Sequence, residues 1–112
     1  MNQAIEHSPE IMQNWVLLAL LEKWLGRTDS CMQICEKILS MDPYNDSAYQ
    51  MKGDIFKGNL KIDEALAQYS KAVQINPESS SAISSIGDVL KFRGQWTEAL
   101  QHYKKSLTLN NN

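Results

Sequence analysis

The side chains best suited to chemistry are two cysteines, Cys31 and Cys35, one helical turn apart. In a helix this spacing places both thiols on one face, as two ligands of a metal site would be. His7 and His102 lie far from them, and neither has an evident nucleophile or carboxylate partner in the sequence. No glycine-rich phosphate loop is present either. We therefore interpret both cysteines as buried small apolar residues and expect no metal, no cofactor and no enzymatic activity.

Two charged pairs recur at equivalent places in the sequence: Asp54 with Lys57, and Asp88 with Lys91. On a helix each aspartate lies one turn before its lysine, so the simplest interpretation is a pair of intrahelical ion pairs on a solvated face. The alternative is that these side chains form hydrogen bonds with a bound peptide.

The overall charge excludes some classes of partner. The 112 residues include 11 Lys and Arg against 13 Asp and Glu, for a formal net charge of −2. Nucleic acids and anionic membranes favour basic surfaces, so neither is an expected partner. The longest apolar run, residues 15–21, is far shorter than the ~20 residues that span a bilayer. Two cysteines are too few for a disulfide framework, so we expect a cytoplasmic protein without membrane insertion.

The elements that position these residues repeat with a period of 34. The three prolines, Pro9, Pro43 and Pro77, follow this spacing, and the segment 65–76 aligns with 99–110. A period of this length indicates a solenoid built from one repeated unit. Apolar spacing and breaks predict two helices in each unit. The expected helices are 9–25, 29–41, 45–57, 63–75, 80–93 and 97–109.

This pattern resembles the tetratricopeptide repeat, a two-helix unit of about 34 residues with small and large residues at fixed places. The second unit matches at Tyr49, Gly53, Phe56, Ala65, Tyr69, Ala72 and Pro77, and the third at Ile83, Ile86, Gly87, Leu90, Ala99 and Tyr103. The first unit matches less well, at Trp15, Leu18, Ala19, Cys31, Cys35 and Pro43. We expect an all-α right-handed solenoid of three helix hairpins with six helices. The expected ranges are an extension at 1–8, repeats at 9–42, 43–76 and 77–110, and a tail at 111–112.

The same pattern predicts the packing inside each unit. Gly53 and Gly87, like Ala19, should lie where the two helices approach most closely. Tyr69 and Tyr103 should fill the wider gap beyond that point.

The resemblance implies a protein–protein interaction module that binds a partner peptide or helix in a concave groove lined by the first helix of each unit. The groove residues expected to bind are Val16, Leu20, Trp24, Gln50, Asp54, Lys57, Ser84, Asp88 and Lys91. Gln13, Lys23, Ser47 and Ser81 should line the same face. One subtype of the family holds a C-terminal carboxylate with Lys, Asn and Arg side chains. The matching positions here are Val16, Leu20, Met51, Ser81 and Ser85, so a clamp of that type is not expected.

The first helix suggests a different function. It is apolar on nearly every side, although a terminal helix of a solenoid is expected to carry a polar outer face. Either residues 1–7 cover it or another protein does, including a second copy in a homodimer. The candidate residues for self-association are Trp15, Val16, Leu17 and Leu21. The last hairpin also lacks a polar cap, so end-to-end association or a longer parent protein are further alternatives. The chain would then be a self-assembling scaffold, or the regulatory or targeting segment of a larger protein.

Overall fold

The computed structural model describes residues 9–110, which form six α-helices and no strand. They are α2 (Pro9–Trp24), α3 (Thr28–Met41), α4 (Asp46–Gly58), α5 (Ile62–Ile75), α6 (Ser80–Phe92) and α7 (Trp96–Asn110). Residues 1–8 and 111–112 lie outside this description, and with them the predicted extension, the predicted tail and any cover of the first helix by residues 1–7. The predicted all-α solenoid is confirmed, and each helix boundary falls close to its expected place.

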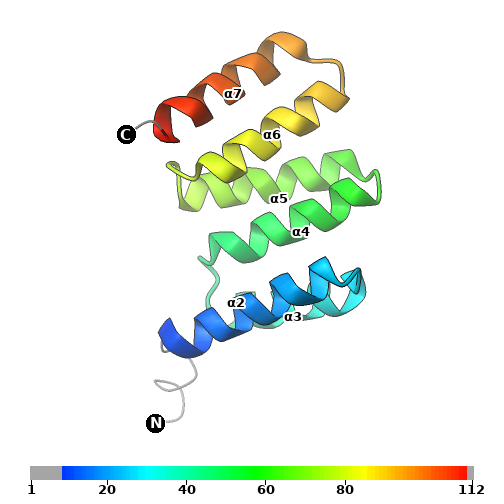
Figure 1. Cartoon of the computed structure of the whole chain (residues 1–112), viewed down its shortest axis with the longest axis vertical. Coiled ribbons are helices and arrows are strands. Elements are labelled where there is room, and N and C mark those ends of the chain that lie inside the picture. The colour runs from blue at the N-terminus through cyan, green and yellow to red at the C-terminus, as the bar shows by residue number, and fades with distance from the viewer. Residues whose placement is uncertain (1–8, 111–112) are drawn as a thin grey trace.

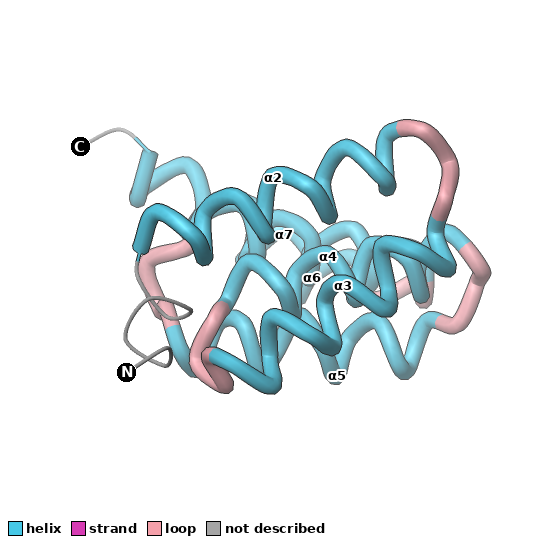
Figure 2. Tube along the Cα trace, turned by 90° about the horizontal axis from the view of Figure 1, so that it is seen from below, coloured by secondary structure: helices cyan, strands magenta, loops and turns pink. Residues whose placement is uncertain are grey.

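The helices form three antiparallel hairpins that stack along the long axis of a body measuring 50 × 32 × 20 Å (Figure 1). α2 lies at one end of the stack and α7 at the other. Seen along that axis, the helices overlap with short loops at both sides (Figure 2). No helix in the described part of the chain is long and apolar enough to cross a bilayer.

Local sequence explains where the helices start. Asn45 caps α4 by accepting a hydrogen bond from the backbone N–H of Ala48 at 3.0 Å. Ser79 caps α6 in the same way, through the N–H of Ala82 at 3.3 Å. A capping side chain satisfies one of the N–H groups that the first helical turn leaves without a partner.

The turn inside each hairpin needs one residue with positive φ. Gly26 (φ 81°) and Gly94 (φ 80°) provide it in the first and third units, as glycine does at little cost. In the second unit this residue is Leu60 (φ 62°), and α4 continues through Gly58, where the sequence predicts a break. α4 ends later than predicted because the residue with positive φ is Leu60, which is equivalent to Gly26 and Gly94, and not Gly58.

Within the second and third hairpins, a tyrosine ring packs directly on a glycine. A Cβ atom at Gly53 would lie 2.6 Å from the ring of Tyr69, and one at Gly87 would lie 2.9 Å from the ring of Tyr103. The prediction that the tyrosines fill a gap beyond the glycines is therefore wrong. In the first hairpin the equivalent residues are Ala19 and Cys35, so a larger residue on one helix is matched by a smaller one on the other.

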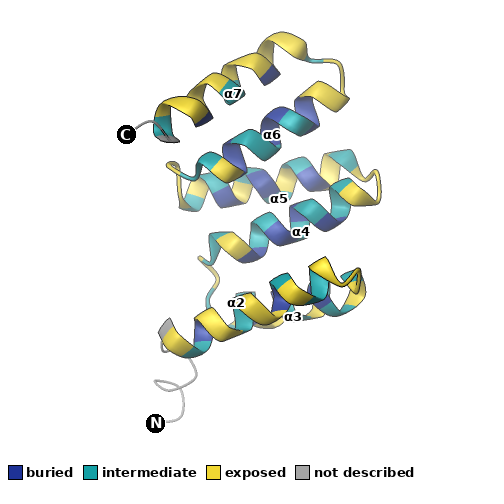
Figure 3. Ribbon diagram, viewed as in Figure 1, coloured by how far each residue is buried: buried dark blue, intermediate teal, exposed yellow. Residues whose placement is uncertain are grey.

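The core consists of two clusters, and each of them crosses a boundary between units. Buried residues of α2, α3 and α4 form one cluster, and those of α5, α6 and α7 form a second. Burial is greatest in the middle helices and least on α2 and α7, which have broad exposed surfaces (Figure 3).

Candidate functional site

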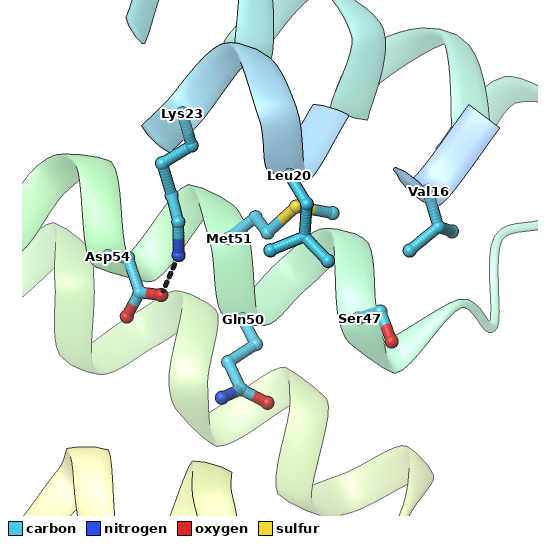
Figure 4. A pocket seen from close by; sticks show the side chains of 7 residues that line it. All are labelled: Val16, Leu20, Lys23, Ser47, Gln50, Met51 and Asp54. Carbon is cyan, nitrogen blue, oxygen red and sulfur yellow. Dashed lines mark hydrogen bonds and ion pairs between the residues drawn. The ribbon is translucent and has the colours of Figure 1, made fainter. Parts of the chain in front are cut away.

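A pocket of about 160 Å³ opens between α2 and α4 (Figure 4). Its apolar floor comes from both helices, because Leu20 of α2 lies beside Met51 of α4. The lining residues are Val16, Leu20, Lys23, Ser47, Gln50, Met51 and Asp54. All except Met51 belong to the groove that the sequence predicts, so the structure brings them together. Met51 is a lining residue that the sequence pattern did not assign to the groove.

Ion pairs link successive units across this face. The Lys23 ammonium lies 2.8 Å from Asp54 Oδ2, and the Lys57 ammonium lies 3.6 Å from Asp88 Oδ2. The predicted pairing of each aspartate with the lysine one turn later in its own helix is wrong. Each aspartate instead receives the lysine of the preceding unit.

A tyrosine from the second helix of the same unit holds each aspartate in place. The Tyr69 hydroxyl donates to Asp54 Oδ1, and the Tyr103 hydroxyl donates to Asp88 Oδ1. One carboxylate oxygen is thereby occupied from within the unit, which leaves Oδ2 for the preceding lysine. We call these two lysine–aspartate–tyrosine arrangements the ladder.

The ladder affects the acidity of its tyrosines. Burial, together with the hydrogen bond to Asp88 and the negative charge of that residue, raises the pKa of Tyr103 to about 12. Burial and Asp54 raise the pKa of Tyr69 in the same direction. Both phenols therefore remain protonated donors at neutral pH, and both carboxylates are engaged inside the protein.

The ladder ends at α2 and at α6. In the first unit Leu20 takes the place of the aspartate and Cys35 that of the tyrosine, so the pocket wall is apolar there. Lys91 occupies the place of Lys23 and Lys57 in the third unit. Its side chain is exposed, and it makes no ion pair among the described residues.

The remaining predicted groove residues of the third unit lie on α6, outside the pocket. Gln50 connects the two regions, because its side-chain amide donates to the hydroxyl of Ser81 on α6. Ser84 lies half-buried on the same helix. Trp24 and the equivalent Phe92 are exposed at the ends of α2 and α6, and neither lines the pocket.

The residues predicted for self-association separate into two faces of α2. Val16 lines the pocket, while Leu17 and Leu21 are exposed away from it. Trp15 is half-buried and borders a second hollow of about 200 Å³, together with Ile11, Asn14 and Leu18.

In the described part of the chain, the remaining candidates for chemistry are the two cysteines and His102. Cys31 and Cys35 are fully buried and free, and burial raises the pKa of both thiols, that of Cys35 to about 12. His102 Nδ1 lies 2.9 Å from the backbone carbonyl oxygen of Glu98. Within residues 9–110 no group of three or more His, Cys, Asp or Glu residues is arranged to hold a metal ion.

Comparison with known proteins identifies the repeat. The family model described as Tetratricopeptide repeat matches residues 13–45 and 46–79, which is more than half of the chain. Among curated protein sequences, none matches.

Solved structures share the fold at low sequence identity. The Yersinia enterocolitica type III secretion translocator chaperone SycD superposes with a TM-score of 0.83 and 16% identity, over 94% of this chain and 78% of that one. The second tetratricopeptide domain of Spaghetti (RPAP3), bound to the HSP90 peptide SRMEEVD, gives 0.76 and 19%, over 89% and 98%. MamA gives 0.78 and 20%, over 89% of this chain, which spans only 58% of the MamA structure.

Proposed function

The chain belongs to the tetratricopeptide repeat family, and we propose that it is a protein–protein interaction module that binds a partner's peptide in the groove of α2, α4 and α6. Two structures of the same fold support this class of function. One is bound to a peptide, and the other is named as a translocator chaperone. Because their identities to this chain are only 19% and 16%, the nature of the peptide must be inferred from the residues of this groove.

The observation that carries the proposal is the pocket between α2 and α4. Val16, Leu20 and Met51 give it an apolar floor, while Ser47 and Gln50 provide hydroxyl and amide groups beside it. Peptide sites commonly combine an apolar anchor position with a few polar groups that fix orientation. We infer that the ligand inserts an aliphatic or aromatic side chain here.

The charges of the groove restrict the remainder of the ligand. Asp54 and Asp88 are each bound by a tyrosine and a lysine, so neither is available as a strong acceptor for a basic peptide. Lys91 is exposed and makes no ion pair with the described residues, so it can receive a carboxylate. The best ligand therefore has an apolar anchor at α2 and α4 and an acidic residue toward α6.

We propose no catalytic function for this module. The two thiols are free and buried, which suits a reducing compartment, and we place the protein in the cytoplasm.

A display selection with a random peptide library would test the proposal. The purified chain should enrich peptides that share an apolar anchor position. Leu20→Glu places a carboxylate in the pocket and should weaken the selected peptides at least tenfold, the effect of losing a central anchor contact. Leu25→Glu is the matched control, because Leu25 is exposed and does not line the pocket. Equal affinities for the two variants would contradict the groove assignment.

A further inference from the structure

The chain contains two copies of its own inter-unit interface. In α4 and α6 the stripe that faces the preceding unit has the helical spacing i, i+3, i+7. It consists of Ala48, Met51 and Ile55 in α4, and of Ala82, Ser85 and Val89 in α6. All of these are buried except Ser85, which is half-buried.

The same stripe in α2 is exposed. Its residues are Asn14, Leu17 and Leu21, and no preceding unit is present among the described residues. Leu21 is 61% exposed, whereas the equivalent Ile55 and Val89 are 6% and 0% exposed. Beside the stripe, Leu18 is also exposed, although its α6 equivalent, Ile86, is buried. We call the four residues Asn14, Leu17, Leu18 and Leu21 the α2 face.

The second helices carry the other half of this interface. Ile62, Leu66 and Val73 of α5 are half-buried against the cluster that contains Val89 and Leu90 of α6. Met32 and Leu39 of α3 pack in the same manner against the cluster that includes α4.

At α7 this second half is open. The residues equivalent to Ile62, Leu66 and Val73 are Trp96, Leu100 and Leu107, which are 66%, 53% and 61% exposed. All three are at least as large as their α5 equivalents. The surface of α7 therefore stays apolar, although no following helix packs on it among the described residues. We call these three residues the α7 face.

The two open faces belong to the helices at opposite ends of the stack (Figures 1 and 3). By position, each is equivalent to one half of the contact between successive units. We propose that copies of this chain associate head to tail, with the α2 face of one copy packed on the α7 face of the next. The arrangement continues an interface that the chain already forms between α3 and α4 and between α5 and α6. It is heterologous and open-ended, because an assembly of any length keeps one free α2 face at one end and one free α7 face at the other.

The internal interface also fixes the register. Arg93, just after α6, lies 3.6 Å from Asp63 at the start of α5, so the start of a second helix meets the end of the next first helix. By the same antiparallel arrangement, Leu107 near the end of α7 would meet the beginning of α2. There it would find the hollow of about 200 Å³ lined by Ile11, Asn14, Trp15 and Leu18.

The polar contacts between two copies would differ from those between successive units of one chain. Within the chain, the lysine of one unit reaches the aspartate of the next. Across two copies Lys91 would face Leu20, so the ladder would not continue. The hydrogen bond from the Gln50 amide to the Ser81 hydroxyl also has an equivalent pair between two copies. There the hydroxyl belongs to Ser84 of one copy and the amide to Gln13 of the next. The association therefore depends mainly on apolar contact and should tolerate salt.

Sedimentation velocity across a hundredfold concentration range tests the proposal with two variants, Leu21→Glu on the α2 face and Leu107→Glu on the α7 face. The wild type should increase in mass with concentration beyond twice 12.7 kDa. Each variant alone should remain near 12.7 kDa. An equimolar mixture of the two should form a 1:1 complex, because each variant keeps the face that the other has lost.

The control is Phe92→Glu, the same change at a similarly exposed apolar residue outside both faces, which should associate as the wild type does. Circular dichroism melts confirm that every variant is folded. A dimer that Leu21→Glu abolishes and Leu107→Glu preserves would mean a symmetric α2 contact and would overturn the proposal. A mixture of the two variants that stays monomeric would also overturn the proposal. So would a wild type that remains monomeric at every concentration, because the two faces would then bind something other than a second copy.

Discussion

Replacing Gly53 with alanine should destabilise the protein, although alanine is the better helix former. Gly53 lies inside α4, where Gly→Ala alone stabilises by about 1 kcal/mol. The new Cβ, however, would lie 2.6 Å from the ring of Tyr69, well inside van der Waals contact. That ring is fully buried and its hydroxyl is bound to Asp54, so it cannot move without breaking the ladder.

The net effect follows from these two opposing contributions. Overpacking a tight core costs about 1–3 kcal/mol, and breaking the hydrogen bond to a charged carboxylate about 1.5–3 kcal/mol. Against a propensity gain of about 1 kcal/mol, these two costs together leave a net loss of about 1.5–5 kcal/mol. Gly87→Ala should cost less, because its Cβ would lie 2.9 Å from Tyr103, which is only half-buried.

Gly58→Ala is the matched control in the same helix. Gly58 ends α4 and has ordinary φ, and no atom lies within 4 Å of the point that its Cβ would occupy. This change should be neutral or slightly stabilising. Urea unfolding followed by circular dichroism would give the order of stability Gly58→Ala, then Gly87→Ala, then Gly53→Ala. If Gly53→Ala is as stable as Gly58→Ala, the ring of Tyr69 does not restrict position 53 to glycine, and the prediction is refuted.

Four further predictions concern the ladder, the thiols and the ligand. Lys23→Met should lower the free energy of unfolding by up to about 1 kcal/mol, and added salt should shrink the difference, as expected for a partly exposed ion pair. Because the folded pKa of Tyr103 is about 12, above the unfolded value near 10, its contribution is complete below pH 10 and is lost as the pH rises toward 12. Urea unfolding at pH 9 and 11 should show this loss, and Tyr103→Phe should reduce it. Cys31 and Cys35 should react with iodoacetamide at pH 8 only at the rate of unfolding, and rapid labelling of the folded protein would show that they are accessible. In a fluorescence polarisation assay, the peptide SRMEEVD should bind much more weakly than the peptides selected by display, because Val16 and Leu20 lie where a clamp for its C-terminal carboxylate would need Lys and Asn.

Periodicity was sufficient to predict the fold. The repeated prolines, glycines and tyrosines indicated three helix hairpins, and the structure has them. The lining of the pocket, apart from Met51, was predicted from the resemblance to the tetratricopeptide repeat, which implied a groove lined by residues such as Leu20 and Gln50.

The ion-pair partners could not be predicted in this way. Spacing along one helix favoured Asp54 with Lys57, but it carries no information about the neighbouring unit. The orientation of Asp54 depends on the hydroxyl of Tyr69, which lies on another helix. A signal was nevertheless present: Leu20 and Cys35 replace the aspartate and the tyrosine together in the first unit, as residues in contact would.

The most direct test of the central claim is an amide NMR titration of the labelled chain with a selected peptide, at a concentration where the chain is monomeric. We expect the shifts to cluster on the pocket residues, above all Val16, Leu20, Gln50 and Met51, and to extend toward Lys91. Shifts confined to the α2 face or the α7 face, with the pocket unchanged, would contradict groove binding and would identify the ends of the stack as the binding surface.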